Sequence, residues 1–351
     1  MGITSRSKLI SICSGNPEYY YKDILDLDNE MTKQFKAARD KGLLPQYLSA
    51  PAYMMWEITS RCPQKCIYCY NSSNVERNEL SSKELFNLAD QIIEMKPFNI
   101  CVTGGEPTLR NEYYESIRYL SSSGILVGTI LSGVGMTEKK AMKIASCAQA
   151  IQVSLDSSRE EVHDFLRQRK GCYKDAVRTI KYFTNHGVKL NISFAATKVN
   201  IDEFPEFHEF VSKLGVDTLR TQKLAISGRA KANREDLRPT QEQYKRYLEY
   251  IEKNSNVKGL CRIEYGDPSV HIKSGLEYEI AVLARISSTG DVGLSPYFDI
   301  YFGNIREQKL KDIWNKMKNG WVNPKVKKIL SDRTSVSDSE IIDNMYETVV
   351  V

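Results

Sequence analysis

Strand-like apolar segments alternate with amphipathic segments from residue 51 to residue 222. The strand-like segments predict strands at 53–59, 99–103, 126–131, 150–155, 189–196 and 217–222. Apolar residues at helical spacing between them predict helices at 81–95, 112–123, 137–146, 173–186 and 201–214. Ser81 or Ser82, followed closely by Glu84, supplies a cap for the first of these helices. This alternation indicates βαβ units and a parallel sheet, and so an α/β fold.

The two ends of the chain have other patterns. Residues 1–50 predict a mostly polar helical lead-in whose helix stops at Gly42, with Pro45 beyond it. After 238 the chain predicts a helix at 241–254 and a hairpin that joins 280–286 to 292–294 through a tight turn. We therefore expect four segments. They are the lead-in at 1–50, a core at 51–238, a small α+β extension at 239–331 and a tail at 332–351.

Composition narrows the possible partners and the compartment. A net charge of +5 over 351 residues is a mild bias and is not typical of a dedicated nucleic-acid binder. No apolar run is long enough to span a membrane, and the first residues have no apolar core of signal-peptide length. The eight cysteines form no disulfide framework, which favours the reducing cytoplasm.

Three of these cysteines stand together in TSRCPQKCIYCY, as Cys62, Cys66 and Cys69 in a C-x3-C-x2-C spacing. Thiolates this close can converge on one soft metal centre, either zinc or an iron–sulfur cluster. A structural zinc site normally has four ligands, but the next cysteine is Cys101. Three ligands on a four-iron cluster would leave one iron open to bind a small molecule.

Two motifs carry a family resemblance. The cysteine motif, with Tyr68 directly before Cys69, resembles the cluster loop of the radical S-adenosylmethionine (radical SAM) enzymes. The later segment ICVTGGEPTL, residues 100–109, resembles the strand-two motif of the same superfamily. The resemblance implies a partial (β/α)6 TIM-like barrel with its cofactors at the carboxyl ends of the strands.

The cofactors that this resemblance implies are one [4Fe–4S] cluster on Cys62, Cys66 and Cys69, and S-adenosylmethionine on the open iron. Gly104, Gly105 and Glu106 would receive the methionine amino group. Reductive cleavage would yield a 5′-deoxyadenosyl radical that abstracts hydrogen from a substrate C–H bond. The electron would come from a donor such as flavodoxin or ferredoxin.

Further positions match the family only in outline. By that match, Tyr68 and Leu224 would lie near adenine, and Ser154, Asp156 and Asn191 near the ribose, with Asn191 also near substrate. Arg167 would pair with the methionine carboxylate. The alternatives are an ordinary packing role for Tyr68, helix capping by Asp156 and a solvated helix arginine at 167.

The ending GNI…L…IW of the extension, from Gly303 to Trp314, resembles a SPASM/twitch domain. Relatives use several cysteines there for auxiliary clusters, but this chain has none after Cys261. We therefore expect a degenerate, cysteine-poor extension and one cluster in the whole protein. Cys261 is a candidate hydrogen-atom donor.

The resemblance implies an enzyme that most often modifies a ribosomally made peptide. A small-molecule substrate, such as a sugar or cofactor precursor, is the first alternative. A non-catalytic metal-binding scaffold is the second.

Overall fold

One sheet runs through the described part of the molecule, with strands in the order β11-β10-β9-β8-β1-β2-β3-β4-β5-β6-β7. The computed structural model describes residues 34, 36–43, 47–334, 349 and 350. Most of the expected lead-in helix and most of the expected tail therefore lie outside the described residues. The strands are β1 (Tyr53–Thr59), β2 (Asn99–Gly104), β3 (Leu126–Leu131), β4 (Ala150–Ser154), β5 (Leu190–Ala195), β6 (Thr218–Gln222), β7 (Arg262–Gly266), β8 (Leu283–Ile286), β9 (Asp291–Gly293), β10 (Ile300–Asn304) and β11 (Val349–Val350).

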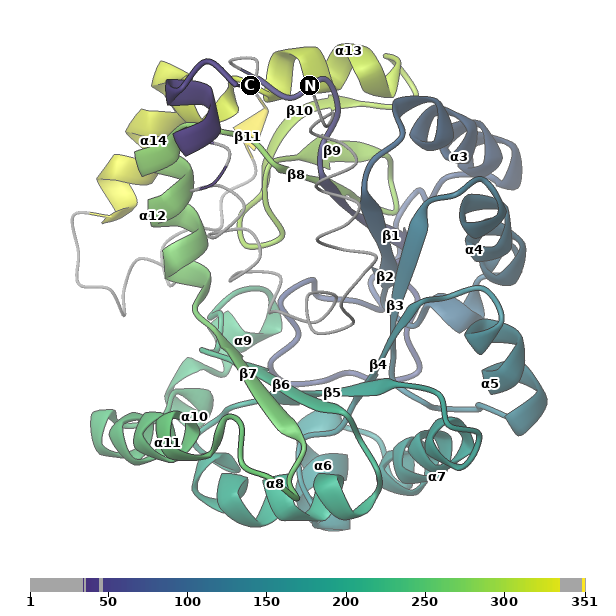
Figure 1. Ribbon diagram of the computed structural model, residues 1–351, viewed down its shortest axis with the longest axis vertical. Coiled ribbons are helices and arrows are strands. Elements are labelled where there is room, and N and C mark those ends of the chain that lie inside the picture. The colour runs from purple at the N-terminus through teal and green to yellow at the C-terminus, as the bar shows by residue number, and fades with distance from the viewer. Residues whose placement is uncertain (1–33, 35, 44–46, 335–348, 351) are drawn as a thin grey trace.

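Strands β1 to β7 are parallel neighbours in chain order, and helices cover their outer face (Figure 1). The sheet stays open, because β7 ends the order and does not pair with β8. This is the expected partial barrel, and all six predicted strands are confirmed to within about two residues at each end.

Helices account for most of the connections. They are α3 (Ser82–Met95), α4 (Tyr113–Ser122), α5 (Glu138–Ala145), α6 (Glu160–Arg167), α7 (Cys172–Asn185), α8 (Phe204–Lys213), α9 (Arg229–Ala232), α10 (Arg234–Leu237), α11 (Gln241–Asn254), α12 (Pro268–Tyr278), α13 (Leu310–Met317) and α14 (Pro324–Thr334). Short 3₁₀ turns are η2 (Pro107–Leu109), η3 (Ile201–Glu203) and η4 (Gly320–Val322). Ser81 caps α3 with the capping box expected from Glu84.

Six helices of the described chain were not expected from the sequence: α6, α9, α10, α12, α13 and α14. Two of them show why the pattern missed them. Helix α6 turns His163 and Arg167 inward, so polar residues occupy part of its buried face and hide the apolar period. Helix α12 carries Gly275, which weakens its helical signal. A Cβ at Gly275 would lie 2.5 Å from the Trp321 ring, so packing excludes a side chain there.

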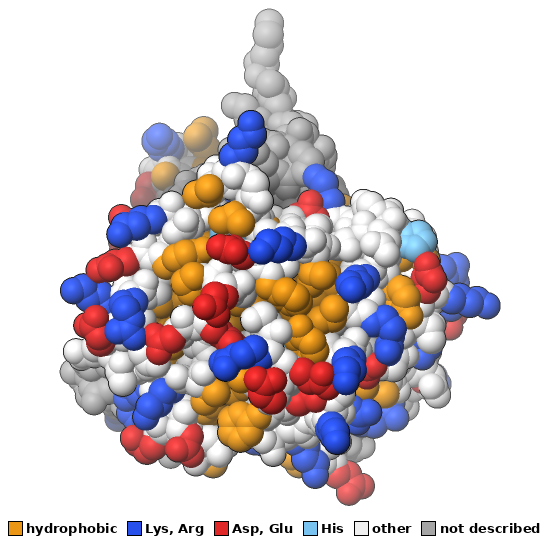
Figure 2. All heavy atoms as spheres, turned by 90° about the horizontal axis from the view of Figure 1, so that it is seen from below, with side chains coloured by type: hydrophobic (Ala, Val, Ile, Leu, Met, Phe, Trp, Pro, Cys, Tyr) orange, Lys and Arg blue, Asp and Glu red, His pale blue; other side chains and the backbone are white. Residues whose placement is uncertain are grey.

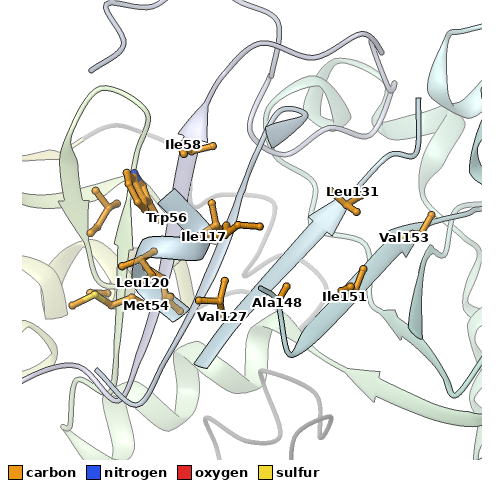
Figure 3. Packing of buried hydrophobic residues seen from close by; sticks show 14 of the residues in the cluster. Met54, Trp56, Ile58, Ile117, Leu120, Val127, Leu131, Ala148, Ile151 and Val153 are labelled. Atoms are coloured by element: carbon orange, nitrogen blue, oxygen red, sulfur yellow. The ribbon is translucent and has the colours of Figure 1, made fainter. Parts of the chain in front are cut away.

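Along each strand, side chains alternate between an outer face that packs against the helices and an inner face that points into the barrel. On β1, Met54, Trp56 and Ile58 point outward and pack with residues of α4 and the neighbouring strands (Figure 3). Between them, Met55 and Glu57 point into the barrel. Core packing therefore fixes which side chains of each strand reach the interior.

The extension is joined to the barrel by strands and by a buried ion pair. Strand β8 lies parallel beside β1, and it forms the expected hairpin with β9. Glu57 of β1 accepts hydrogen bonds from Arg285 of β8 at 3.0 and 3.1 Å, and Arg285 also reaches Asp299 at 2.8 Å. Strand β7, beyond the expected boundary at 238, pairs with β6, so the barrel sheet continues into residues assigned to the extension.

The surface carries mixed charge. On the face in Figure 2, basic and acidic side chains are interspersed around apolar patches. Among the described residues, no helix combines the length and the apolar character that crossing a membrane requires.

Candidate active site

A cavity of about 280 Å³ opens at the carboxyl ends of the barrel strands. Its wall includes all three cysteines of the C-x3-C-x2-C motif, together with residues from β1 to β6 and from the extension. Of the other expected site residues, the wall includes Tyr68, Gly104, Gly105, Ser154, Arg167 and Leu224. Segments far apart in the sequence therefore meet at one place, as the parallel sheet predicts.

The cysteine loop leaves β1 and is held from two sides. Its amides at Lys65 and Ile67 donate to the carbonyls of Arg167 and Leu166, which would otherwise be unpaired at the end of α6. On the other side, Arg229 donates from its backbone to Cys69 O at 3.0 Å and from Nε to Cys66 O at 2.8 Å. The backbone between the cysteines is thus fixed by elements on opposite sides of the barrel mouth.

The seven cysteines within the described residues are free thiols. Burial raises the pKa of Cys62 to about 12 and that of Cys66 to about 11. Metal binding would displace these protons, since thiolates are the ligands.

The spacing of the thiols bears on what they can hold. Across the described part of the chain, no group of three His, Cys, Asp or Glu side chains lies close enough to hold one metal ion. Thiolates on a single tetrahedral zinc lie about 3.8 Å apart, given Zn–S bonds of about 2.3 Å. A cubane of four irons is larger and holds its thiolates further apart. The residues present fit such a cluster by ligand type, spacing along the chain and shared cavity.

Two glycines let the end of β2 lie against the cysteine loop. Gly104 has a φ of +139°, and a Cβ there would lie 2.3 Å from Thr59 O. A Cβ at Gly105 would lie 2.2 Å from Arg61 O. Because no Cβ is present, the backbones come close enough to pair. The amide of Gly105 donates to Thr59 O at 2.7 Å, and the amide of Glu106 donates to Arg61 O at 2.8 Å. Only glycine permits this approach of two backbones.

Replacing Gly105 with Ala is expected to lower the free energy of unfolding of the metal-free protein by about 1–3 kcal/mol, because the added methyl forces two backbones apart. Urea denaturation followed by circular dichroism measures this. Gly128→Ala is the matched control, since a Cβ there meets Ala150 at an ordinary 3.5 Å. Equal stability of the two variants would contradict the close approach.

Glu106 lies behind the cavity wall. Its carboxylate accepts hydrogen bonds from the backbone and hydroxyl of Ser132 at 2.6 and 2.5 Å, and from those of Thr108 at 3.2 and 2.6 Å. Ser132 itself lines the cavity. The carboxylate would reach a ligand ammonium only by exchanging one of these bonds.

Arg167 is buried and lines the cavity, so it is not the solvated arginine of the alternative interpretation. Its Nε lies 2.7 Å from Oδ2 of Asp156, which also accepts a hydrogen bond from the Tyr68 hydroxyl at 2.5 Å. Burial alone would raise the pKa of Asp156, but Arg167, His163 and these hydrogen bonds hold it below its usual value. Asp156 stays ionised and orients both cavity residues.

Besides Glu106, three expected site residues lie outside the cavity wall. Asp156 does not line the cavity, because its carboxylate is fully buried beneath Arg167 and Tyr68. Asn191 is buried on the interior face of β5, on the same face as Ser193, which does line the cavity. Cys261 precedes β7 and therefore lies at the amino ends of the strands, away from the cavity, so this arrangement does not bring it to the other candidate site residues.

The cavity wall also contains residues that the sequence did not single out. They include Gln64, Ser132, Gln152, Arg220, Gln222, Arg229 and Tyr297. Tyr297 comes from the extension, and its hydroxyl lies 3.4 Å from Gln222 Oε1. A Pro-Tyr pair after a hairpin gives no sequence signal for a site, because only the fold brings it over the barrel.

The comparison with known protein families agrees with this site. Residues 56–211 match the Radical SAM superfamily, a range that contains the three cysteines, both glycines and Arg167. Residues 56–211 belong to the radical SAM superfamily.

The chain is similar in sequence to two relatives of stated activity. Over 264 residues the chain is 32% identical to mycofactocin maturase MftC of Mycolicibacterium smegmatis. The aligned region covers 71% of this chain and 65% of the maturase. The chain thus covers slightly less than two thirds of that maturase. It is also 25% identical over 288 residues to the AdoMet-dependent heme synthase of Methanosarcina barkeri, covering 76% of this chain and 82% of the relative.

Solved radical SAM structures share the fold. SuiB of Streptococcus suis, crystallised with S-adenosylmethionine, superposes with a TM-score of 0.65 at 16% identity. The match covers 88% of this chain and 75% of SuiB. At this identity the similarity shows the shared fold.

Proposed function

We propose that this chain is a radical SAM enzyme that modifies a peptide. The observation that carries the proposal is the meeting of Cys62, Cys66 and Cys69 with the glycine pair and Arg167 around one cavity. Mycofactocin maturase and the SuiB structure determined with its precursor peptide SuiA support a peptide substrate. A reducing, cytoplasmic setting fits the free thiols.

The proposed cofactors are one [4Fe–4S] cluster on the three cysteines and S-adenosylmethionine in the cavity. When bound, this pair supplies a 5′-deoxyadenosyl radical by one-electron reduction, and the chemistry belongs to the cofactors.

In this proposal, residues of the chain bind and orient S-adenosylmethionine. The cationic guanidinium of Arg167 provides a partner for the methionine carboxylate. Gly104 and Gly105 allow the ligand to approach the backbone. Tyr68 and Leu224 contribute apolar surface for adenine, while Ser154 offers a hydroxyl to the ribose. Asn191 lies one step deeper on β5, outside the cavity wall, so we propose no ligand contact for it.

The protein also fixes the side chains of the cavity wall and limits the water that reaches the cavity. Asp156 fixes the positions of Arg167 and the Tyr68 hydroxyl from beneath the wall. Pro296 and Tyr297 of the extension also line the cavity. Limiting the water in the cavity protects a reactive radical from side reactions.

A small-molecule substrate is the second candidate, and one observation favours it. The chain covers more of the AdoMet-dependent heme synthase than of the maturase. A tetrapyrrole or a peptide could each enter a cavity that is open on one side.

Anaerobic purification and cluster reconstitution test the proposal. We expect about four irons per chain, and formation of 5′-deoxyadenosine and methionine after addition of S-adenosylmethionine and dithionite. Incubation with a peptide encoded next to the gene should then give a mass change in that peptide. Zinc in place of iron, or no 5′-deoxyadenosine, would refute the enzyme. Cofactor cleavage without a peptide mass change, but with turnover of a small molecule, would select the second candidate.

A further inference from the structure

The outward side of the cysteine loop carries a group of exposed cations. We call Arg61, Lys65, Arg169 and Lys170 the basic patch; all four are exposed. Two large apolar side chains accompany them, Leu109 with 41% and Phe165 with 52% of its surface exposed. Exposed cations of this kind complement the surface of an acidic partner, and the two apolar side chains add area that such a partner could cover.

Direct contacts make this patch continuous around Cys62. Arg61 precedes Cys62 and donates from Nη2 to Leu109 O at 2.9 Å. Arg169, which directly follows α6, donates from Nη1 to Pro63 O at 3.1 Å. The Lys65 amide bonds the end of α6 at Arg167 O. The patch therefore covers the outer side of the loop whose inner side lines the cavity.

The positive charge of the patch is largely uncompensated. Within the described residues, no carboxylate lies within ion-pair distance of Lys65, Arg169 or Lys170, and Arg61 is 4.0 Å from Glu79. The neighbouring Asp164 is turned inward, where it accepts the amides of Gly171 and Tyr173. The exposed carboxylates Glu160 and Glu161 lie in the first turn of α6, at the end away from Arg169.

We propose that the basic patch, with Leu109 and Phe165, is the docking surface for a small acidic one-electron carrier protein. The proposal rests on the proposed function, which consumes one electron for each cofactor cleavage. Cys62 is only half-buried, so the loop is a thin layer between the carrier and the cluster. One electron passes inward, the carrier is oxidised by one electron, and no bond forms or breaks at the surface. Complementary charge would both orient the carrier and speed its association.

Binding of a reduced recombinant flavodoxin, measured by isothermal titration calorimetry at about 0.05 M salt and again at about 0.3 M, tests the proposal. We expect the double variant Lys65→Glu/Lys170→Glu to bind about tenfold more weakly at low salt and to lose most of the salt dependence. Because Lys65 stands between two cluster cysteines, a second variant, Phe165→Ser/Lys170→Glu, leaves the loop unchanged and should also weaken binding. Iron content confirms that each variant carries its cluster.

The matched control is Lys139→Glu/Lys140→Glu, which reverses two exposed lysines on α5, elsewhere on the barrel. It should bind flavodoxin like the wild type, and dithionite should reduce the clusters of all variants at equal rates. Unchanged affinity in both patch variants, or an equal loss in the control, would overturn the docking surface. A ferredoxin that binds where flavodoxin does not would still support it if the patch variants weaken that binding. If dithionite yields no 5′-deoxyadenosine, the proposed function fails; if dithionite succeeds and no acidic carrier binds, only the docking surface fails.

Discussion

Replacing Cys66 with Ala is expected to leave the protein with much less than the wild-type content of about four irons per chain and with no measurable 5′-deoxyadenosine formation. Cys66 is buried at the cavity wall, between α6 and Arg229. Loss of its thiolate leaves two cysteines, too few to hold a four-iron cluster firmly. Iron analysis, the visible absorption spectrum and chromatography of the nucleoside products measure the effect.

The matched control for this variant is Cys147→Ala. Cys147 is also a buried free thiol, but it follows α5 and does not line the cavity. It should keep both its iron and its cofactor cleavage. Retention of iron and turnover in the Cys66 variant would refute the assignment of the cluster, whatever the control does.

The strands of the barrel could be predicted because their outer faces obey one local rule. Met54, Trp56 and Ile58 alternate with interior residues, and the outer set packs against helices. That alternation needs no knowledge of the rest of the chain. Helix α6 does not follow the rule, because two of its inward side chains contact Asp156 in the loop after β4. Arg167 pairs with the Asp156 carboxylate, and His163 Nδ1 accepts a hydrogen bond from the Asp156 amide.

The site was predictable only where its residues stand close together in the sequence. The cysteines and the glycine pair are short motifs, and the parallel sheet brings them to the same edge. Arg229 and Ser132 could not be predicted, because each acts through a bond to a segment distant in the sequence: Arg229 to the carbonyl of Cys66, and Ser132 to Glu106.

Direction along a strand explains why Cys261 lies apart from the cavity. The sequence alone named Cys261 as a candidate hydrogen-atom donor. In the structure it leads into β7, which runs parallel to β6, so it lies at the amino ends. Its carbonyl accepts a hydrogen bond from His208 Nε2 at 2.6 Å, and its amide donates to Ser212 Oγ at 2.9 Å. These contacts belong to helix packing below the cavity.

The second large effect is expected from Arg167→Met, which should lower the free energy of unfolding by about 3–5 kcal/mol at neutral pH, because it leaves a buried charge on Asp156 without its cation. Asp156 is fully buried, and its remaining partners are the Tyr68 hydroxyl and the amide of Ala195 at 3.0 Å. Denaturation of the metal-free protein isolates this effect from cofactor binding.

The pH dependence has a definite sign. In the wild type the pKa of Asp156 is held below its usual value, so its contribution to stability is complete above about pH 4 and falls as the pH drops through the folded pKa. In Arg167→Met, burial raises that pKa instead, and protonation relieves the unpaired charge. The deficit of the variant should therefore shrink as the pH falls from neutral toward about 5.

The double variant Arg167→Met/Asp156→Asn separates the loss of stability caused by the unpaired Asp156 charge from the loss of cofactor binding caused by the missing cation. Asn keeps the size of Asp156 and carries no charge, so the double variant should recover most of the stability that the single variant loses. It should still bind S-adenosylmethionine poorly after cluster reconstitution, because the cation that lines the cavity is gone. A loss of less than about 1 kcal/mol in the single variant would mean that water reaches Asp156 and that the pair behaves as an exposed one. Full cofactor affinity in the double variant would show that Arg167 only supports the wall.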